Sequence, residues 1–102
     1  MTTVVHDLPS MQRGVTDAWK SLDVATVNHN AVRLRVMKNK IAQWHRHAAS
    51  DELFYVLSGT VFIDTEHATH TLLPGQLLVV PAGMQHRARA TGRATLLVID
   101  QI

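Results

Sequence analysis

From residue 24 onward, apolar and polar residues alternate with the period of two that is typical of β-strands. Val32, Leu34 and Val36 are separated by arginines, which indicates a half-buried strand. No stretch in this part of the chain carries apolar residues at the helical period of about 3.6 residues. Strands are expected over residues 24–27, 31–37, 41–47, 52–64, 70–73, 76–80, 85–90 and 95–101. Short strands at such intervals, with turn residues between them, predict an all-β sandwich or barrel.

The first 22 residues show no usable periodicity, and they are expected to form an irregular arm with one short helical turn. This arm, residues 1–22, and the barrel, residues 23–102, are predicted to form a single domain. Asn28, His29 and Asn30 form a polar turn between the first two predicted strands, which is the pattern of a hairpin.

Composition narrows the class of protein. A chain of 102 residues with 46% apolar residues supports one compact domain, and with no cysteine it has no disulfide framework. No apolar run approaches the roughly 18 residues that span a bilayer, and the N-terminus lacks the basic-then-apolar pattern of a signal peptide. We therefore expect a cytoplasmic protein without membrane contact.

The net charge of +2 is small, and its only local basic cluster is Arg87, Arg89 and Arg93. On a strand, Arg87 and Arg89 would face outward. No basic helix and no interleaved aromatic residues accompany them, so a solvated strand face is favoured over a nucleic-acid patch.

Two motifs concentrate metal-binding side chains. The first reads H-x-H-x4-E-x6-G and contains His45, His47 and Glu52. Residues two apart on a strand share a face, so the two histidines project together. Small and turn-forming residues at 48–51 let the chain reverse and bring Glu52 beside them. The second motif, G-x5-P-x-G-x2-H, ends at His86.

These two motifs resemble the paired signatures of the cupin superfamily, G-x5-H-x-H-x3-4-E-x6-G and G-x5-P-x-G-x2-H-x3-N, over residues 39–90. Asn39 replaces the first glycine and Ala90 the final asparagine. Asn tolerates a positive φ, so a turn at Asn39 is still expected. The resemblance, to a small single-domain cupin, implies a jelly-roll-like β-barrel. It also implies four metal ligands, which are His45, His47, Glu52 and His86.

Three imidazoles and one carboxylate suit one divalent transition metal per chain, and Fe, Mn, Ni, Zn, Co and Cu are all compatible. Each residue alone is readily explained as surface. Together, four such side chains inside a barrel would be costly if left unpaired, which favours a metal site. The other histidines, His6, His29, His67 and His70, are expected in solvated loops.

Strand parity predicts the lining of a substrate pocket beside the metal. The inward residues on the same strands are expected to make the pocket largely apolar, and Gln43 is its one additional polar group. Gln43 is expected either to orient a ligand or to contact substrate. The candidates are Gln43, Phe54, Val56, Met84 and Ala88.

An outward apolar stripe, Leu53, Tyr55 and Leu57 next to Trp44, is too apolar for a solvated face. It either packs on the arm or a second sheet, or forms a homodimer interface.

Two functions remain open. The resemblance implies a metalloenzyme acting on a small oxygenated molecule, of the dioxygenase, isomerase or decarboxylase type. The alternative is a metal-dependent barrel that binds or senses a small molecule without turnover. In both cases a small-molecule ligand or substrate is the expected partner.

Overall fold

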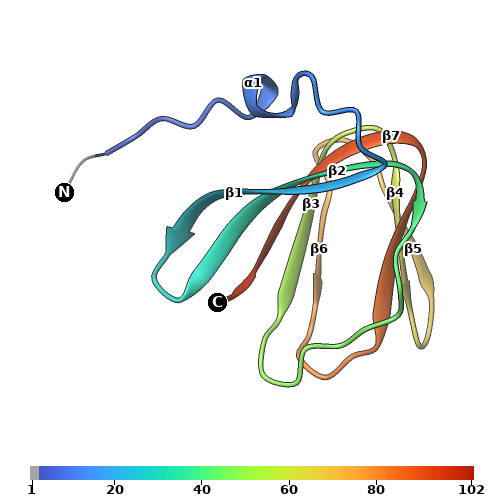
Figure 1. Ribbon diagram of the computed structural model, residues 1–102. Helices are drawn as coiled ribbons and strands as arrows, with labels where there is room; N and C mark the ends of the chain where they lie inside the picture. Colours follow the sequence, from blue (N-terminus) through green and yellow to red (C-terminus); the bar gives the residue numbers. More distant parts are fainter. Residues whose placement is uncertain (1–2) are drawn as a thin grey trace.

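The computed structural model describes residues 3–102 as a jelly-roll-like β-barrel preceded by an extended arm (Figure 1), which confirms the all-β prediction. Its elements are α1 (Leu8–Gln12), β1 (Trp19–Val27), β2 (Asn30–Ile41), β3 (Glu52–Ser58), β4 (Val61–Thr65), β5 (Thr69–Leu72), β6 (Leu77–Val80) and β7 (His86–Gln101). No helix within residues 3–102 is long and apolar enough to cross a bilayer.

Strand β7 pairs with three other strands of the barrel, β2, β3 and β4. All pairings are antiparallel, in the order β1-β2-β7-β3-β6, while β4 pairs with both β5 and β7. One edge of β7 pairs with β2 over most of its length, and its other edge is shared between β3 and β4. Residues 85–90 and 95–101 were expected as two strands, but the continuous partner β2 holds them together as one.

Asn39 has the expected positive φ, but it lies at a bulge inside β2 and not at a turn. Its φ of 48° is positive, and the β2–β7 register shifts between Lys38 and Lys40. The backbone N–H of Gly92, where β7 also has a positive φ, donates to Asn39 Oδ1 at 2.6 Å. Asn39 therefore supplies both the backbone conformation and a hydrogen bond that ties the bends of two strands together.

Three strand boundaries differ from the sequence prediction. Strand β1 begins at Trp19, so the irregular arm ends at residue 18 rather than 22, because residues 19–22 extend the ladder with β2. Residues 52–64 divide into β3 and β4 at Gly59, where a Cβ would lie 2.4 Å from the Arg93 carbonyl oxygen. Residues 42–47 follow the edge of β7 through separate contacts at Ala42 and His45, not as a continuous strand.

The two faces of β2 are both covered. Met37 belongs to the buried core cluster, so its face is the interior one, and the ladder puts Arg33 and Arg35 on that same face. Leu34 and Val36 lie on the outer face, where they are fully buried and α1 contacts β2. The arm thus replaces solvent on the outside of the sheet, and the arginines turn inward.

Candidate metal centre

Backbone pairing places His45 beside His86. The N–H of each residue donates to the carbonyl oxygen of the other, at 2.9 Å and 2.8 Å, in an isolated antiparallel bridge. Directly opposed residues project to the same side, and the two ring centroids lie 4.3 Å apart. The irregular segment of residues 42–47 therefore pairs with β7 at His45, and this pairing sets the two imidazoles side by side.

The predicted chain reversal brings Glu52 beside the His45 and His86 rings. Residues 48–49 form bends, and Glu52 opens β3 with only 3% of its surface exposed. Two hydrogen bonds stabilise this chain reversal. Asp51 Oδ1 accepts from the Ala82 N–H at 2.9 Å, and the His47 carbonyl accepts from the Gly83 N–H at 2.8 Å. The loops of the two motifs are thus hydrogen-bonded to each other.

The donor atoms converge on the Glu52 carboxylate. Its Oε1 lies 2.6 Å from His86 Nε2 and 3.5 Å from His45 Nε2, and its Oε2 lies 3.5 Å from His47 Nε2. All four residues offer a donor atom within 4.8 Å of the others. Donors bound to one ion at about 2.1 Å lie roughly 3 to 4 Å apart, so this histidine–glutamate cluster fits a single divalent metal.

Backbone carbonyl groups orient the rings of His86 and His45. His86 Nδ1 lies 2.9 Å from the Met84 carbonyl oxygen, and His45 Nδ1 lies 3.2 Å from the Gln43 carbonyl oxygen. A carbonyl accepts only, so each Nδ1 carries the proton and donates. Each Nε2 points toward Glu52, and once His86 gives up the proton it shares with Glu52, both rings would offer an Nε2 lone pair to a metal.

His47 supplies the strongest sign of an intended ligand. Its Nε2 is buried and makes no hydrogen bond among the described residues, although Glu52 Oε2 lies 3.5 Å and Asp100 Oδ2 lies 3.8 Å away. A buried polar nitrogen without a partner costs free energy. A metal ion bound by the histidine–glutamate cluster would satisfy it.

The charges within the cluster stabilise each other. Burial opposes ionisation of Glu52, but the hydrogen bond from His86 and the nearby imidazoles hold the pKa of its carboxyl below the usual value. Burial also disfavours the imidazolium form of His86, but its bonds to Glu52 and to the Met84 carbonyl raise its pKa above the usual value. Without metal, a proton shared by this pair compensates the buried carboxylate.

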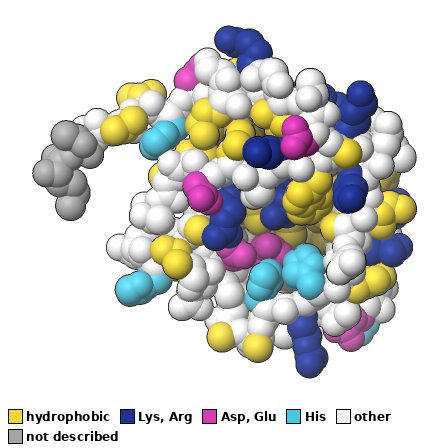
Figure 2. Space-filling view, viewed as in Figure 1, with side chains coloured by type: hydrophobic (Ala, Val, Ile, Leu, Met, Phe, Trp, Pro, Cys, Tyr) yellow, Lys and Arg dark blue, Asp and Glu magenta, His cyan; other side chains and the backbone are white. Residues whose placement is uncertain are grey.

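A cavity of about 440 Å³ opens beside the cluster, and we call it the metal cavity. Figure 2 shows histidine, acidic and basic side chains gathered on one face of the barrel. Charged and aromatic groups dominate the lining, which corrects the expectation of a largely apolar pocket. The lining residues are Trp19, Arg33, Arg35, Ala42, Gln43, Trp44, His45, His47, Glu52 and Asp100.

Of the predicted pocket residues, only Gln43 lines the metal cavity. Phe54, Val56 and Ala88 are at most 2% exposed in the core cluster, and Met84 packs against that cluster. The cavity opens toward β1 and β2, whereas these four side chains fill the interior behind the ligands. Phe54, for example, packs edge-on against the His86 ring at a centroid distance of 5.9 Å.

Sequence reasoning missed three charged residues of the cavity. Asp100 is buried and accepts from Arg33 Nη1 at 2.9 Å, with His47 on its other oxygen. Arg33 and Arg35 were assigned to the solvated face of a half-buried strand. The sequence feature that could have identified Arg33 and Arg35 as cavity residues is the presence of two arginines at alternate positions of a central barrel strand.

The remaining histidines are solvent-exposed as predicted, although His70 lies in β5 and not in a loop. His6, His29, His67 and His70 are all exposed, and none belongs to the histidine–glutamate cluster.

Arg87 and Arg89 do not form a free basic patch. The Nε atoms of both donate to Asp64, at 2.8 Å and 2.7 Å, and Asp64 is 5% exposed.

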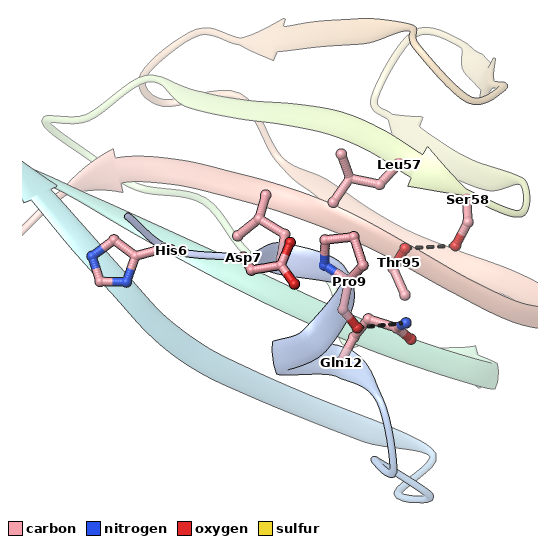
Figure 3. Close-up of a pocket in the computed structure, with 8 residues that line it drawn as sticks. His6, Asp7, Pro9, Gln12, Leu57, Ser58 and Thr95 are labelled. Carbon is pink, nitrogen blue, oxygen red and sulfur yellow. Dashed lines mark hydrogen bonds between the residues drawn. The ribbon is translucent and has the colours of Figure 1, made fainter. Parts of the chain in front are cut away.

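A larger cavity, of about 540 Å³, lies under the arm and carries no such chemistry. Figure 3 shows Pro9 and Gln12 of the arm on one side of this arm groove, and Leu57, Ser58 and Thr95 on the other. Ser58 and Thr95 bond to each other at 2.6 Å, and the other polar lining residues, His6, Asp7 and Gln12, belong to the arm. The arm groove is therefore a feature of packing between arm and sheet.

Known proteins place the fold and the cluster in a family. The cupin domain model matches residues 32–100. YdbB, an uncharacterized protein of Bacillus subtilis, is 32% identical over 97 residues, which are 94% of this chain and 85% of YdbB. An acireductone dioxygenase of Rhodopseudomonas palustris is 39% identical over 59 residues, which are 54% of this chain and 35% of that enzyme.

Among solved structures, a cupin-2 domain protein of Shewanella frigidimarina has a TM-score of 0.89 and 26% identity, covering 96% of this chain and 95% of its own. The matched family region contains the entire histidine–glutamate cluster and more than half of the chain. This chain belongs to the cupin family.

Proposed function

We propose that this protein is a metalloenzyme that acts on a small oxygenated molecule through one divalent ion in the histidine–glutamate cluster. The observation that carries the proposal is the buried, unpartnered Nε2 of His47 among three other converging donors, next to an open cavity. A structural metal site is usually closed by its protein ligands, whereas a catalytic one keeps a side open to small molecules.

The chain's own residues have distinct parts in this proposal. His45, His47, Glu52 and His86 would hold the ion, which would supply Lewis-acid or redox chemistry to a bound molecule. Asp100 would add a negative charge beside the ion, because its Oδ2 lies 3.8 Å from His47 Nε2 while its Oδ1 accepts from Arg33. The similarity to an acireductone dioxygenase supports an oxygenase-type reaction, although it covers only 54% of this chain.

The experiment is anaerobic purification followed by elemental analysis and an oxygen-uptake screen with Fe(II). Bound iron with substrate-dependent oxygen uptake would support the oxygenase form of the proposal. Stoichiometric zinc or nickel with conversion of an oxygenated substrate, but without oxygen uptake, would support an isomerase or decarboxylase.

The controls separate metal binding from catalysis. His86→Ala should abolish both metal content and turnover, whereas His67→Ala, which alters an exposed turn, should change neither. A protein that retains metal and binds small molecules but converts none of them would overturn the enzyme proposal and leave a binding barrel.

We also propose that two copies associate through the outer face of β3 and β6. Leu77 and Val79 are 57% and 46% exposed there, beside the half-buried Tyr55. Trp44, expected on this stripe, lines the metal cavity instead, where the Arg87 guanidinium stacks 4.7 Å from its ring. The occupant we infer is a second copy, because the extended arm exposes 95% of Val5 and offers an apolar segment to cross over (Figure 1).

Sedimentation should then give a dimer at micromolar concentration. Tyr55→Glu should dissociate it, because a charge would be buried in a self-complementary contact. His67→Glu, in the exposed turn after β4, should leave the dimer intact. A wild-type protein that sediments as a monomer contradicts the association.

A further inference from the structure

Arg35 is a half-buried cation in the wall of the metal cavity. It lies in the middle of β2, opposite Leu96 of β7, on the face of the strand that points into the barrel. Its guanidinium stacks on the Trp19 ring at 4.4 Å from the ring centroid. Burial lowers its pKa, while the carboxylates of Glu52 and Asp100 act in the opposite direction.

Within residues 3–102, the Arg35 guanidinium has no hydrogen bond and no carboxylate within ion-pair distance, and its Nε is buried without a partner. Arg33, on the same face of β2, shows the contrast: its guanidinium contacts Asp100 at 2.9 Å and Asp23 at 3.3 Å. A buried N–H without an acceptor is costly, and the rest of the unpaired guanidinium lines the metal cavity, so this side chain calls for an external partner.

The nearby carboxylates are already engaged. Glu52 is surrounded by the three imidazoles, and Asp100 is bound to Arg33 and faces His47. Neither is within ion-pair distance of Arg35. The donors of Arg35 are therefore available to a molecule that enters the cavity.

The charge of the loaded cavity favours an anion. Two arginines and two carboxylates line it, so their charges balance, and a divalent ion would add an excess of about two positive charges. A guanidinium fork matches the two oxygens of a carboxylate in geometry as well as charge. The volume of about 440 Å³ suits a small molecule.

We propose that Arg35 is the anion-binding residue of the metal cavity, and that the molecule bound there is a small organic acid. Its carboxylate would contact Arg35, and a second oxygen would face the histidine–glutamate cluster. This inference rests on the proposed metal-dependent function and names the chemical class of its substrate.

The test is calorimetric titration of pyruvate, and of its uncharged methyl ester, into the Zn²⁺-loaded protein. Pyruvate should bind to the wild type, and Arg35→Gln should weaken that binding roughly 10- to 100-fold, the range for a lost charge-assisted hydrogen bond. The methyl ester should bind weakly and equally to both. Arg46→Gln, which removes an exposed arginine outside the cavity, should behave as the wild type.

Metal content, measured in the same samples, separates this inference from the proposed function. If Arg35→Gln retains Zn²⁺ and still binds pyruvate as the wild type does, the anion site is refuted while the metal site stands. Absence of pyruvate binding to a Zn²⁺-loaded wild type also refutes it. If the wild type binds no metal, the proposed function fails, and pyruvate binding that depends on Arg35 would still support the anion site.

Should Arg35→Gln fail to fold, Arg35→Lys carries the test, because it retains the charge and loses only the fork. Its pyruvate affinity should fall with metal content unchanged. Unchanged pyruvate affinity in Arg35→Lys would show that the guanidinium fork is not the binding group.

Discussion

Metal binding to the histidine–glutamate cluster should release a proton. In the metal-free protein His86 Nε2 and Glu52 Oε1 are 2.6 Å apart, and this contact raises the pKa of His86 above its usual value. A metal ligand must be a neutral imidazole. An ion that enters the cluster therefore displaces the proton that this pair shares.

The magnitude follows from proton linkage. Below the raised pKa of His86, each ion bound should release about one proton from this pair. The apparent Kd for Zn²⁺ should then rise about tenfold for each unit by which the pH falls, or about 1.4 kcal/mol per unit. Above that pKa the dependence on His86 should disappear.

Isothermal titration with Zn²⁺ at several pH values, each in two buffers of different protonation enthalpy, measures both quantities. His86→Ala should lose at least about 100-fold in affinity, since even the loss of a residue that only supports a ligand costs 10- to 100-fold. His67→Ala should match the wild type. Tight binding with no proton release at any pH of the series would refute the reasoning, because the ion would then leave the His86–Glu52 pair undisturbed.

Three further outcomes are expected. Chelation should lower the melting temperature and leave a folded β-protein by circular dichroism, because the core does not depend on the cluster. Metal at 100 times its Kd raises the free energy of unfolding by only about 2.7 kcal/mol. Complete unfolding by chelator would contradict this prediction. Burial opposes ionisation of Asp64, but bonds from Arg89, Arg87 and Thr69 hold its pKa well below the usual value. The stability that ionised Asp64 contributes is therefore present above pH ~4 and lost as the pH falls through the folded-state pKa. Asp64→Asn should lower the free energy of unfolding by roughly 2 kcal/mol at pH 7 and weaken its dependence on pH in the acid range. An unchanged acid dependence would show that Asp64 is not responsible. Gly59→Ala should destabilise the fold by more than the ~1 kcal/mol of a typical substitution, because φ is 76° and the new Cβ would lie 2.4 Å from a β7 carbonyl; an unchanged urea midpoint would show that β7 moves aside freely.

The sequence by itself determined the fold class and the membership of the cluster. Period-two patterning identifies strands because successive side chains alternate between two faces. The motif spacings bring His45, His47, Glu52 and His86 together, since both motifs carry their own turn residues. The positive φ at Asn39 was also predictable, because asparagine tolerates it, although the structure uses it for a bulge in β2 and not for a turn.

Only the tertiary structure decided which face of β2 points inward. Alternation separates Leu34 and Val36 from Arg33 and Arg35 but does not say which pair is interior when both faces are covered. The arm buries the apolar face from outside, and so the arginines enter the metal cavity. Long-range pairing also brings Asp100, at the far end of the chain, beside His47. Such contacts depend on strand partners distant in sequence, and local patterning does not contain them.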